Sequence, residues 1–276
     1  MLTTLFLNTN PIAIKFGTIS IYWYGIAYVL GVILGIYVTQ LLERKYKIAD
    51  IAPKNFDSLA VYIVIGIIIG GRLGYVLFYM PSYIIDEPIE ILNIWHGGMS
   101  FHGGMIGVTI AIWLFCLRYK KKFLAVTDLT ACATPIGLFF GRIANFINVE
   151  LYGKKTGVDW GVIFPNIDLQ PRHPSQLYEA FTEGFLLFLI MLAIVRISNI
   201  RKYAGRISGV FLISYSIFRM LVEMFREPDS HIGYIFNLIT LGQLLCFPML
   251  ILGIFLYMRK NTITKAYKNK ISLQIF

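Results

Sequence analysis

The sequence has few charged residues for its length. Of its 276 residues, 14% are charged and 57% are apolar, whereas soluble domains usually carry about 25% and about 45–50% of these classes. A soluble monomer of this composition would expose large apolar patches, which soluble monomers avoid. The composition therefore argues against a single soluble globular domain.

Cysteine is also scarce. Cys116, Cys132 and Cys246 all lie inside apolar runs. They provide neither a disulfide framework nor the spacing of metal ligands, so we expect them to be buried as small apolar residues. The glycine-rich segment 96–104 is not followed by the Lys-Ser/Thr of a phosphate-binding P-loop.

Long apolar runs are abundant. A membrane-spanning helix needs about 20 mostly apolar residues. The sequence has seven such stretches, at residues 19–41, 56–80, 99–117, 123–148, 178–196, 209–226 and 235–258. The first lacks a preceding basic segment and a small-residue cleavage site, so we expect an uncleaved span. The pattern predicts an all-α membrane protein with seven transmembrane helices. We expect residues 1–276 to form a single domain, with an outer loop region at 149–177.

The basic residues alternate between loops along the chain. The loops after the first, third and fifth stretches and the C-terminal tail carry 17 of the 25 Lys and Arg residues, and the opposite loops carry five. Cytoplasmic loops are enriched in Lys and Arg, so the pattern predicts an outside N-terminus and a cytoplasmic C-terminus. This orientation explains the net charge of +10, and no nucleic-acid partner is expected.

Glycines recur at four-residue spacing within the apolar stretches. Small residues at that spacing form a ridge that lets two helices approach closely. The glycines concerned are Gly31, Gly35, Gly66, Gly70, Gly74, Gly137 and Gly141. We interpret this pattern as structural.

Ionisable residues inside a membrane are costly and are functional candidates for that reason. The second stretch contains Arg72, and the outer end of the fourth contains Arg142. In the sixth stretch, Tyr215, Arg219, Glu223 and Arg226 are spaced so that they share one helical face. Arg219 and Glu223 could neutralise each other in an intrahelical salt bridge, but that pair leaves the other two residues unexplained.

The segment 172–179 has a simpler interpretation. It is a turn that runs into a helix, because Pro174 near the start and Glu179 in the first turns both suit a helix N-terminus.

Most of the polar candidates are predicted at one depth, on the outer side of the membrane. They are Arg72, His102, Arg142, Asn145, Glu150, Arg219, Glu223 and Arg226. Independent salt bridges need not share a depth, whereas arginines gathered at the outer leaflet form a site for an anion such as a phospholipid phosphate. The planar fork of Arg can bind phosphate through two hydrogen bonds. A neutral His nearby can accept a proton.

Six ordered motifs resemble a known family. Residues 141–150 (GRIANFINVE) resemble the signature of the bacterial prolipoprotein diacylglyceryl transferases. Five further blocks agree in order, namely 23–25 (WYG), 70–79 (GGRLGYVLFY), 97–104 (GGMSFHGG), 172–179 (RHPSQLYE) and 218–229 (FRMLVEMFREPD). Val149 is a small departure, because this position in the family is most often Gly.

The resemblance implies a reaction. The family transfers the diacylglyceryl group of phosphatidylglycerol to the lipobox cysteine of a prolipoprotein, just after its signal peptide. The product is a thioether, glycerol phosphate leaves, and no metal or soluble cofactor is required. The resemblance further implies a multi-pass protein of the bacterial inner membrane, surrounded by membrane lipids, with an active site toward the outer leaflet.

The resemblance also implies roles for individual residues. His102 is the candidate base with Tyr24 close by, and Arg142 and Arg219 hold the phosphate and activate the leaving group. The remaining residues expected to bind or support the lipid headgroup are Arg72, Asn145, Glu150, Gly153, Tyr215, Glu223 and Arg226.

A second class of function uses the same arginines. A seven-span transporter or lipid-binding protein could move or hold an anion without covalent chemistry. It would place ionisable residues throughout the membrane depth, whereas only Asp128 is predicted deep toward the inner side.

Overall fold

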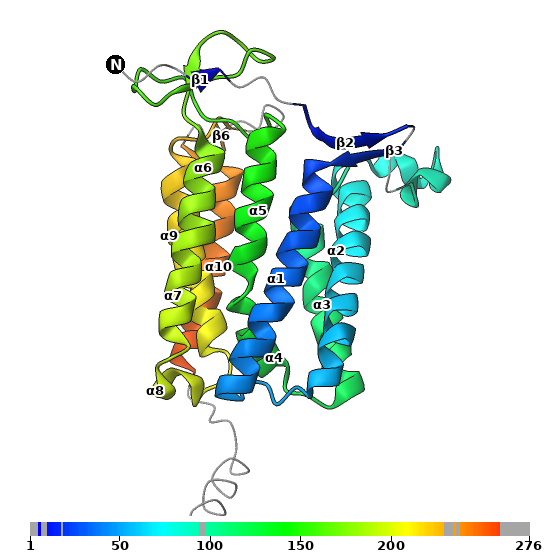
Figure 1. The fold of residues 1–276 in the computed structure, drawn as a ribbon, viewed down its shortest axis with the longest axis vertical. Helices are drawn as coiled ribbons and strands as arrows, with labels where there is room; N and C mark the ends of the chain where they lie inside the picture. Colours follow the sequence, from blue (N-terminus) through cyan, green and yellow to red (C-terminus); the bar gives the residue numbers. More distant parts are fainter. Residues whose placement is uncertain are drawn as a thin grey trace, which may run out of the picture. The chain divides into compact units, whose positions relative to one another are not determined.

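The computed structural model describes residues 5–6, 10–17, 19–93, 98–228, 234–235 and 238–259. Helices form most of these residues (Figure 1). The chain divides into two compact units. Unit 1 comprises residues 1–37 and 130–276, and unit 2 comprises residues 38–129.

Helical segments overlap all seven predicted stretches. They are α1 (Trp23–Tyr46), α2 (Phe56–Tyr79), α3 (Phe101–Tyr119), α4 (Phe123–Ala131) with α5 (Thr134–Ile147), α6 (Ser175–Glu179) with η5 (Ala180–Leu186) and α7 (Leu187–Ile194), α9 (Arg206–Glu223) and α10 (Leu241–Met258). Short helical turns occur at η1 (Pro53–Asn55), η2 (Pro81–Ile84), η3 (Pro88–Ile91) and α8 (Ser198–Arg201).

Fewer helices than seven pass a test of length and composition. Within the described ranges, four are long and apolar enough to cross a membrane, or five if α4 and α5 together form one broken span. The sixth predicted stretch, α9, is not among them, and its 18 residues include Arg206, Arg219 and Glu223. The chain is therefore a mainly helical, multi-pass membrane protein, and seven spans remain a prediction.

Two of the predicted stretches are not continuous α-helices. The fourth is interrupted between α4 and α5, where Pro135 occupies the first turn of α5. Proline is tolerated there because the first-turn N–H has no partner within the helix. In the fifth, η5 is a π-helix, a wider and rarer form that is frequent at functional sites.

Short strands are the feature that the all-α prediction omits. A hairpin of β2 (Ile12–Phe16) and β3 (Ile19–Tyr22) precedes α1. A small sheet has the order β1 (Leu5–Phe6), β4 (Val162–Ile163) and β5 (Pro171–Arg172), and β6 (Tyr234–Ile235) pairs with β7 (Ile239–Thr240). In the small sheet, Val162 lies opposite Arg172, so the pairing folds the loop after α5 back on itself.

In unit 2, glycines bring α2 and α3 into direct backbone contact. A Cβ atom added to Gly66 would lie 2.7 Å from the carbonyl oxygen of Gly107, and one added to Gly74 would lie 2.6 Å from the Cα of Gly103. No larger residue fits these positions without moving a helix. The predicted glycine ridge on the second stretch therefore has a packing role.

In unit 1, α5 lies beside the α6–η5–α7 series, and α9 lies against α10 (Figure 1). Glycines again allow close approach. A Cβ added to Gly209 would lie 2.7 Å from the carbonyl oxygen of Gly253, and one added to Gly31 of α1 would lie 3.1 Å from the Cα of Gly137. This packing brings residues from four sequence regions together around one point.

Candidate functional site

Glu179, at the end of α6, lies at the centre of a buried cluster of charged side chains in unit 1. Its Oε2 atom is 2.6 Å from Nε of Arg142, and its Oε1 atom is 2.6 Å from Nη1 of Arg219. Nη1 of Arg226 is 3.6 Å from the same Oε1. The exposed fraction of Glu179 is 0%. One carboxylate thus bridges arginines from α5 and α9.

Two further carboxylates complete the cluster. Glu183 of η5 lies 3.5 Å from Nη2 of Arg142 and 3.6 Å from Nη1 of Arg219. Oε2 of Glu223 lies 2.6 Å from Nη2 of Arg219. The three arginines and three glutamates cancel in formal charge. Such pairing is expected of ionisable groups in a membrane interior.

The polar face predicted for the sixth stretch is buried. Tyr215, Arg219, Glu223 and Arg226 are each less than a tenth exposed. The intrahelical pair of Arg219 and Glu223 is present, and Arg219 also reaches Glu179 and Glu183. The pair is therefore one part of a larger network that joins α5, α6, η5 and α9.

Thr240 connects this network to α10. It is the N-cap residue of that helix, and its hydroxyl oxygen accepts a hydrogen bond from the Gln243 amide at 3.3 Å. The same hydroxyl donates to Oε1 of Glu223 at 2.9 Å. Helix capping and support of the charged cluster thus share one side chain.

Asn145 connects the cluster to α1. Its Oδ1 accepts a hydrogen bond from Nη1 of Arg142 at 3.4 Å, and its Nδ2 lies within donating distance of the Tyr24 hydroxyl (3.0 Å) and of Oε2 of Glu150 (2.9 Å). Asn145 is buried, Tyr24 is half-buried and Glu150 is exposed. The network therefore runs from the buried arginines to the surface of unit 1.

Gly153 joins the outer loop to the end of α9. Its amide donates to the carbonyl of His173 at 3.0 Å, and the residue forms a β-bridge with Arg226. A Cβ atom there would overlap the His173 carbonyl oxygen and lie 2.8 Å from the carbonyl oxygen of Phe225. Only glycine allows this approach.

A second charged cluster orders the outer loop. Arg172 donates to the Gly153 carbonyl at 3.0 Å, lies 2.8 Å from Oδ2 of Asp168 and lies 3.3 Å from Oε2 of Glu227. The hydrogen bond from Arg172 lowers the pKa of Asp168 below 3.8. Burial, assisted by the positive charge of Lys154, lowers the pKa of the neighbouring His173 below 6.5. The contacts of Arg172 hold the outer loop in place directly before α6 begins at Ser175.

Two predicted site residues, Arg72 and His102, belong to unit 2. Arg72, in unit 2, donates to the carbonyl oxygens of Glu90, Ile91 and Gly98. His102 lies in the first turn of α3, and its side chain falls outside the described part of the structure, as does the segment 94–97. The lipid-binding role of Arg72 and the base role of His102 stay predictions.

Sequence reasoning missed Glu179 and Glu183 as members of the site. Glu179 could be explained as a negative charge near the N-terminus of a helix. Both residues lie near the start of the apolar stretch 178–196. Two acidic residues four apart face one side of a helix. In a chain that also has three arginines at the same predicted depth, that spacing was the available signal.

The fold and the site define a multi-pass membrane protein with a buried arginine–glutamate cluster next to an ordered outer loop. A family model described as prolipoprotein diacylglyceryl transferase matches residues 11–259. The chain therefore belongs to the prolipoprotein diacylglyceryl transferase family.

Relatives named phosphatidylglycerol–prolipoprotein diacylglyceryl transferase agree with this assignment. One from Rickettsia typhi is 52% identical over 256 residues, which cover 92% of this chain and 98% of the relative. One from Rickettsia felis is 52% identical, with 93% and 98% covered. One from Rickettsia bellii is 51% identical, with 94% and 99% covered.

Proposed function

We propose that this protein transfers the diacylglyceryl group of phosphatidylglycerol to the thiol of the lipobox cysteine in a prolipoprotein. The relatives' shared name pairs phosphatidylglycerol with a prolipoprotein in a diacylglyceryl transfer. The observation that carries the proposal is that Arg142 and Arg219 meet at Glu179. Each guanidinium group lies 2.6 Å from a different carboxylate oxygen of Glu179. Two guanidinium groups held this close can bind one phosphate.

The reaction forms a carbon–sulfur bond and breaks a carbon–oxygen bond. The thiolate attacks the terminal glycerol carbon of the diacylglyceryl group, and glycerol phosphate leaves with the electron pair of the broken bond. The thiol proton passes to a base, for which His102 is our candidate. Negative charge develops on the leaving phosphate, and preorganised cations lower the barrier where charge develops.

The contacts around Arg142 suggest how phosphate enters. A guanidinium has five N–H donors. Nε of Arg142 is held by Glu179 at 2.6 Å, whereas Nη1 and Nη2 have longer contacts of 3.4 and 3.5 Å with Asn145 and Glu183. We assign Nη1 and Nη2 to the phosphate oxygens. Glu179 then keeps the guanidinium in place while the lipid exchanges.

The other residues shape or support this site. We assign Tyr24, Asn145, Glu150 and Gly153 to binding of the lipid headgroup, which is supported by the hydrogen bonds of Asn145 with Tyr24 and Glu150. Tyr215, Glu223 and Arg226 support Arg219 from its own helix and the residues that follow. Arg72 remains a candidate ligand for the lipid from unit 2.

Mass spectrometry tests the proposed activity. Membranes containing the protein are incubated with phosphatidylglycerol and a lipobox peptide, and the peptide should gain the mass of one diacylglyceryl group. Arg142→Ala, expressed at the normal level, should abolish the gain. Undiminished transfer by that variant would remove the phosphate role from Arg142. Anion transport without a peptide product would favour the transporter class instead.

The base role of His102 has a separate test. His102→Gln should slow transfer at neutral pH and recover at alkaline pH, where the peptide thiol ionises without help. A rate that stays low at alkaline pH would assign His102 to positioning.

The proposed topology has seven spans in one domain, with an outside N-terminus, a cytoplasmic C-terminus and the site at the outer leaflet of the bacterial inner membrane. It is supported by helical segments in all seven stretches and by the excess of Lys and Arg in alternate loops. In intact cells, an impermeant maleimide should label Gly157→Cys but not Lys202→Cys. The reverse pattern would overturn the orientation.

A further inference from the structure

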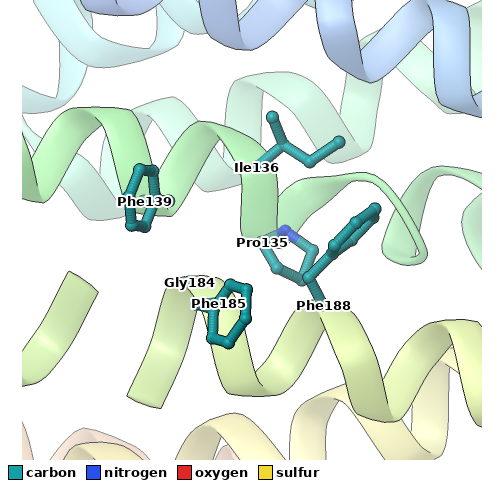
Figure 2. Close-up of a pocket in the computed structure, with 6 residues that line it drawn as sticks. All are labelled: Pro135, Ile136, Phe139, Gly184, Phe185 and Phe188. Atoms are coloured by element: carbon teal, nitrogen blue, oxygen red, sulfur yellow. The ribbon is translucent and has the colours of Figure 1, made fainter. Parts of the chain in front are cut away.

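The polar network of unit 1 depends on how α5 ends. In the first half of this helix, Pro135 and Phe139 line an apolar pocket together with residues of η5 and α7 (Figure 2). Arg142 and Asn145 lie in the second half. The hydrogen bonds of Asn145 join Arg142 to Glu150, which lies beyond the last residue of the helix. The position of Glu150 is therefore set by the turn at residues 148–151 that terminates α5.

This turn begins as a Schellman motif, a hydrogen-bonding pattern that commonly ends an α-helix. The amide of Glu150 donates to the carbonyl oxygen of Asn145 at 2.9 Å, and the amide of Val149 donates to the carbonyl oxygen of Phe146 at 3.2 Å. The pattern requires a left-handed backbone at the position of Val149, where helices usually have Gly. The turn thus satisfies the carbonyls of the helix end with a side chain that suits the conformation poorly.

Two residues of the turn have a strained backbone. The φ angle is +60° at Val149 and +55° at Leu151. Positive φ is uncommon for residues other than Gly, and it is an outlier for a β-branched residue such as Val. Conformations of this kind are costly and persist only where the surrounding structure enforces them. The turn therefore needs contacts from outside itself.

Two side chains from the first turn of α6 provide such contacts. Nε2 of Gln176 donates to the carbonyl oxygen of Glu150 at 2.6 Å, and Oγ of Ser175 donates to the carbonyl oxygen of Leu151 at 2.9 Å. The exposed fraction of both residues is 0%, so water does not compete for either bond. Each bond fixes a peptide group that adjoins a strained residue.

We propose that Gln176 and Ser175 are positioning residues for the phosphate site. They hold the turn in the conformation that brings Oε2 of Glu150 to 2.9 Å from Nδ2 of Asn145. Oδ1 of Asn145 accepts a hydrogen bond from Nη1 of Arg142, which is one of the nitrogens that we assign to the phosphate oxygens. This inference rests on the proposed function and extends it to two fully buried residues that act through Glu150 and Asn145.

Lipid binding to the purified full-length protein tests this role. Gln176→Met removes the hydrogen-bond donor and keeps the length of the side chain. The turn should then relax at Val149, and the binding conformation becomes a minor population, which lowers the apparent affinity in proportion. We expect the Kd for radiolabelled phosphatidylglycerol in detergent micelles to rise about tenfold, a population change typical of one strained residue. Gln170→Met is the matched control, because Gln170 is exposed in the outer loop, and it should leave the Kd unchanged.

A second substitution shows whether the hydrogen bond acts against backbone strain. Gly adopts positive φ without a steric penalty, so Val149→Gly should restore most of the affinity that Gln176→Met loses. Val149→Ala also shortens the side chain but keeps the penalty at positive φ, so it should restore none. Rescue by both substitutions or by neither would overturn the positioning role, as would an unchanged Kd in Gln176→Met.

Thermal midpoints separate positioning from folding. A merely structural role of Gln176 predicts a lower midpoint with an unchanged Kd, which would overturn the proposal. If Gln176→Met does not fold, Ser175→Ala makes the same test at the next carbonyl. It should raise the Kd, and Leu151→Gly should restore the affinity because it removes the strain at that residue. The absence of either effect would contradict the proposal.

Transfer assays distinguish this inference from the proposed function. If Gln176→Met transfers the diacylglyceryl group at the normal rate when the lipid is below saturation, the positioning role fails and the proposed function stands. If the unsubstituted protein forms no thioether, but Gln176→Met weakens lipid binding and Val149→Gly restores it, the proposed function fails and the positioning role stands.

Discussion

Unit 1 contains two arginine–carboxylate clusters that differ in their surroundings. In the helical cluster, Glu179 and Glu183 are fully buried, and each contacts an arginine from a neighbouring helix. In the outer-loop cluster, Arg172 is buried, but the side chains of its partners Asp168 and Glu227 are 27% and 45% exposed. The pairings are chemically alike, and their dielectric environments differ.

The difference separates two uses of an ion pair. Water near the outer-loop cluster screens its charges, so its main effect is to fix a loop. The helical cluster lies where charges are expensive, and removal of one partner leaves another uncompensated. A site that must receive an anionic phosphate needs the second arrangement, because cations held there interact strongly with developing charge.

The largest expected effect comes from breaking the central pair. Glu179→Gln removes the charge that Arg142 and Arg219 share and should lower the free energy of unfolding by about 3–5 kcal/mol. The control, Glu227→Gln, removes a half-exposed partner of Arg172 and should cost less than about 1 kcal/mol. Denaturation in detergent micelles measures both. Equal losses would mean that the two clusters do not differ in the way described.

The next effect concerns catalysis. Arg142→Lys keeps the charge but loses the planar fork, so it should slow diacylglyceryl transfer about 10²-fold, the effect of one lost donor at a developing charge. Arg172→Lys makes the same change in the outer-loop cluster and should leave the rate unchanged. The rates of diacylglyceryl transfer at saturating lipid concentration measure both effects. Comparable slowing in both variants would mean that the helical cluster and the outer-loop cluster do not differ in their contribution to catalysis.

A smaller effect tests the link between the outer loop and α9. Gly153→Ala pushes a Cβ atom onto the His173 carbonyl oxygen and should cost about 1–3 kcal/mol through overpacking. Gly157→Ala is the matched control in the same loop, because a Cβ there meets no atom within 4 Å. The difference in thermal midpoint between the two variants measures the effect. No difference would show that the loop yields freely.

The smallest effect is a pH dependence confined to the outer-loop cluster. His173 and Asp168 both have a lowered pKa in the folded protein. The unfolded chain therefore binds protons first, and stability falls as pH decreases. The His173 contribution is lost below pH 6.5 and the Asp168 contribution below pH 3.8. His173→Gln should weaken the dependence of the thermal midpoint on pH below pH 6.5, and Asp168→Asn should weaken it below pH 3.8. A pH dependence that is the same as in the unsubstituted protein would contradict the assignment.

Hydropathy predicted where helices occur but not their form. Apolar runs located the helical segments because membrane helices need long apolar sequences. The break before Pro135 and the π-helix at Ala180–Leu186 depend on backbone geometry, which an average over composition does not contain. The short strands were missed because each has at most five residues, too few to show a clear alternating pattern, and because β1 pairs with the distant β4.

The candidate site was predictable where its residues share one helix. The spacing of Tyr215, Arg219 and Glu223 identified a polar face without any knowledge of tertiary structure. The role of Glu179 was harder to predict from the sequence, because its partners come from α5 and α9 and contact it only in the packed structure. A charge near the start of a helix has a local explanation, and that explanation obscured the tertiary one.

The double role of Thr240 has a consequence for biosynthesis. Its hydroxyl both caps α10 and donates to Glu223, and Gly242 leaves the space that the Glu223 carboxylate occupies. The chain leaves the ribosome from the N-terminus, so Tyr24 and Arg142 enter the membrane long before Thr240 does. The polar network closes only when the last helix arrives. Before that step, the nascent chain contains all six charged residues of the cluster but lacks the hydrogen bond from Thr240 to Glu223, and synthesis of α10 is the step that completes the network.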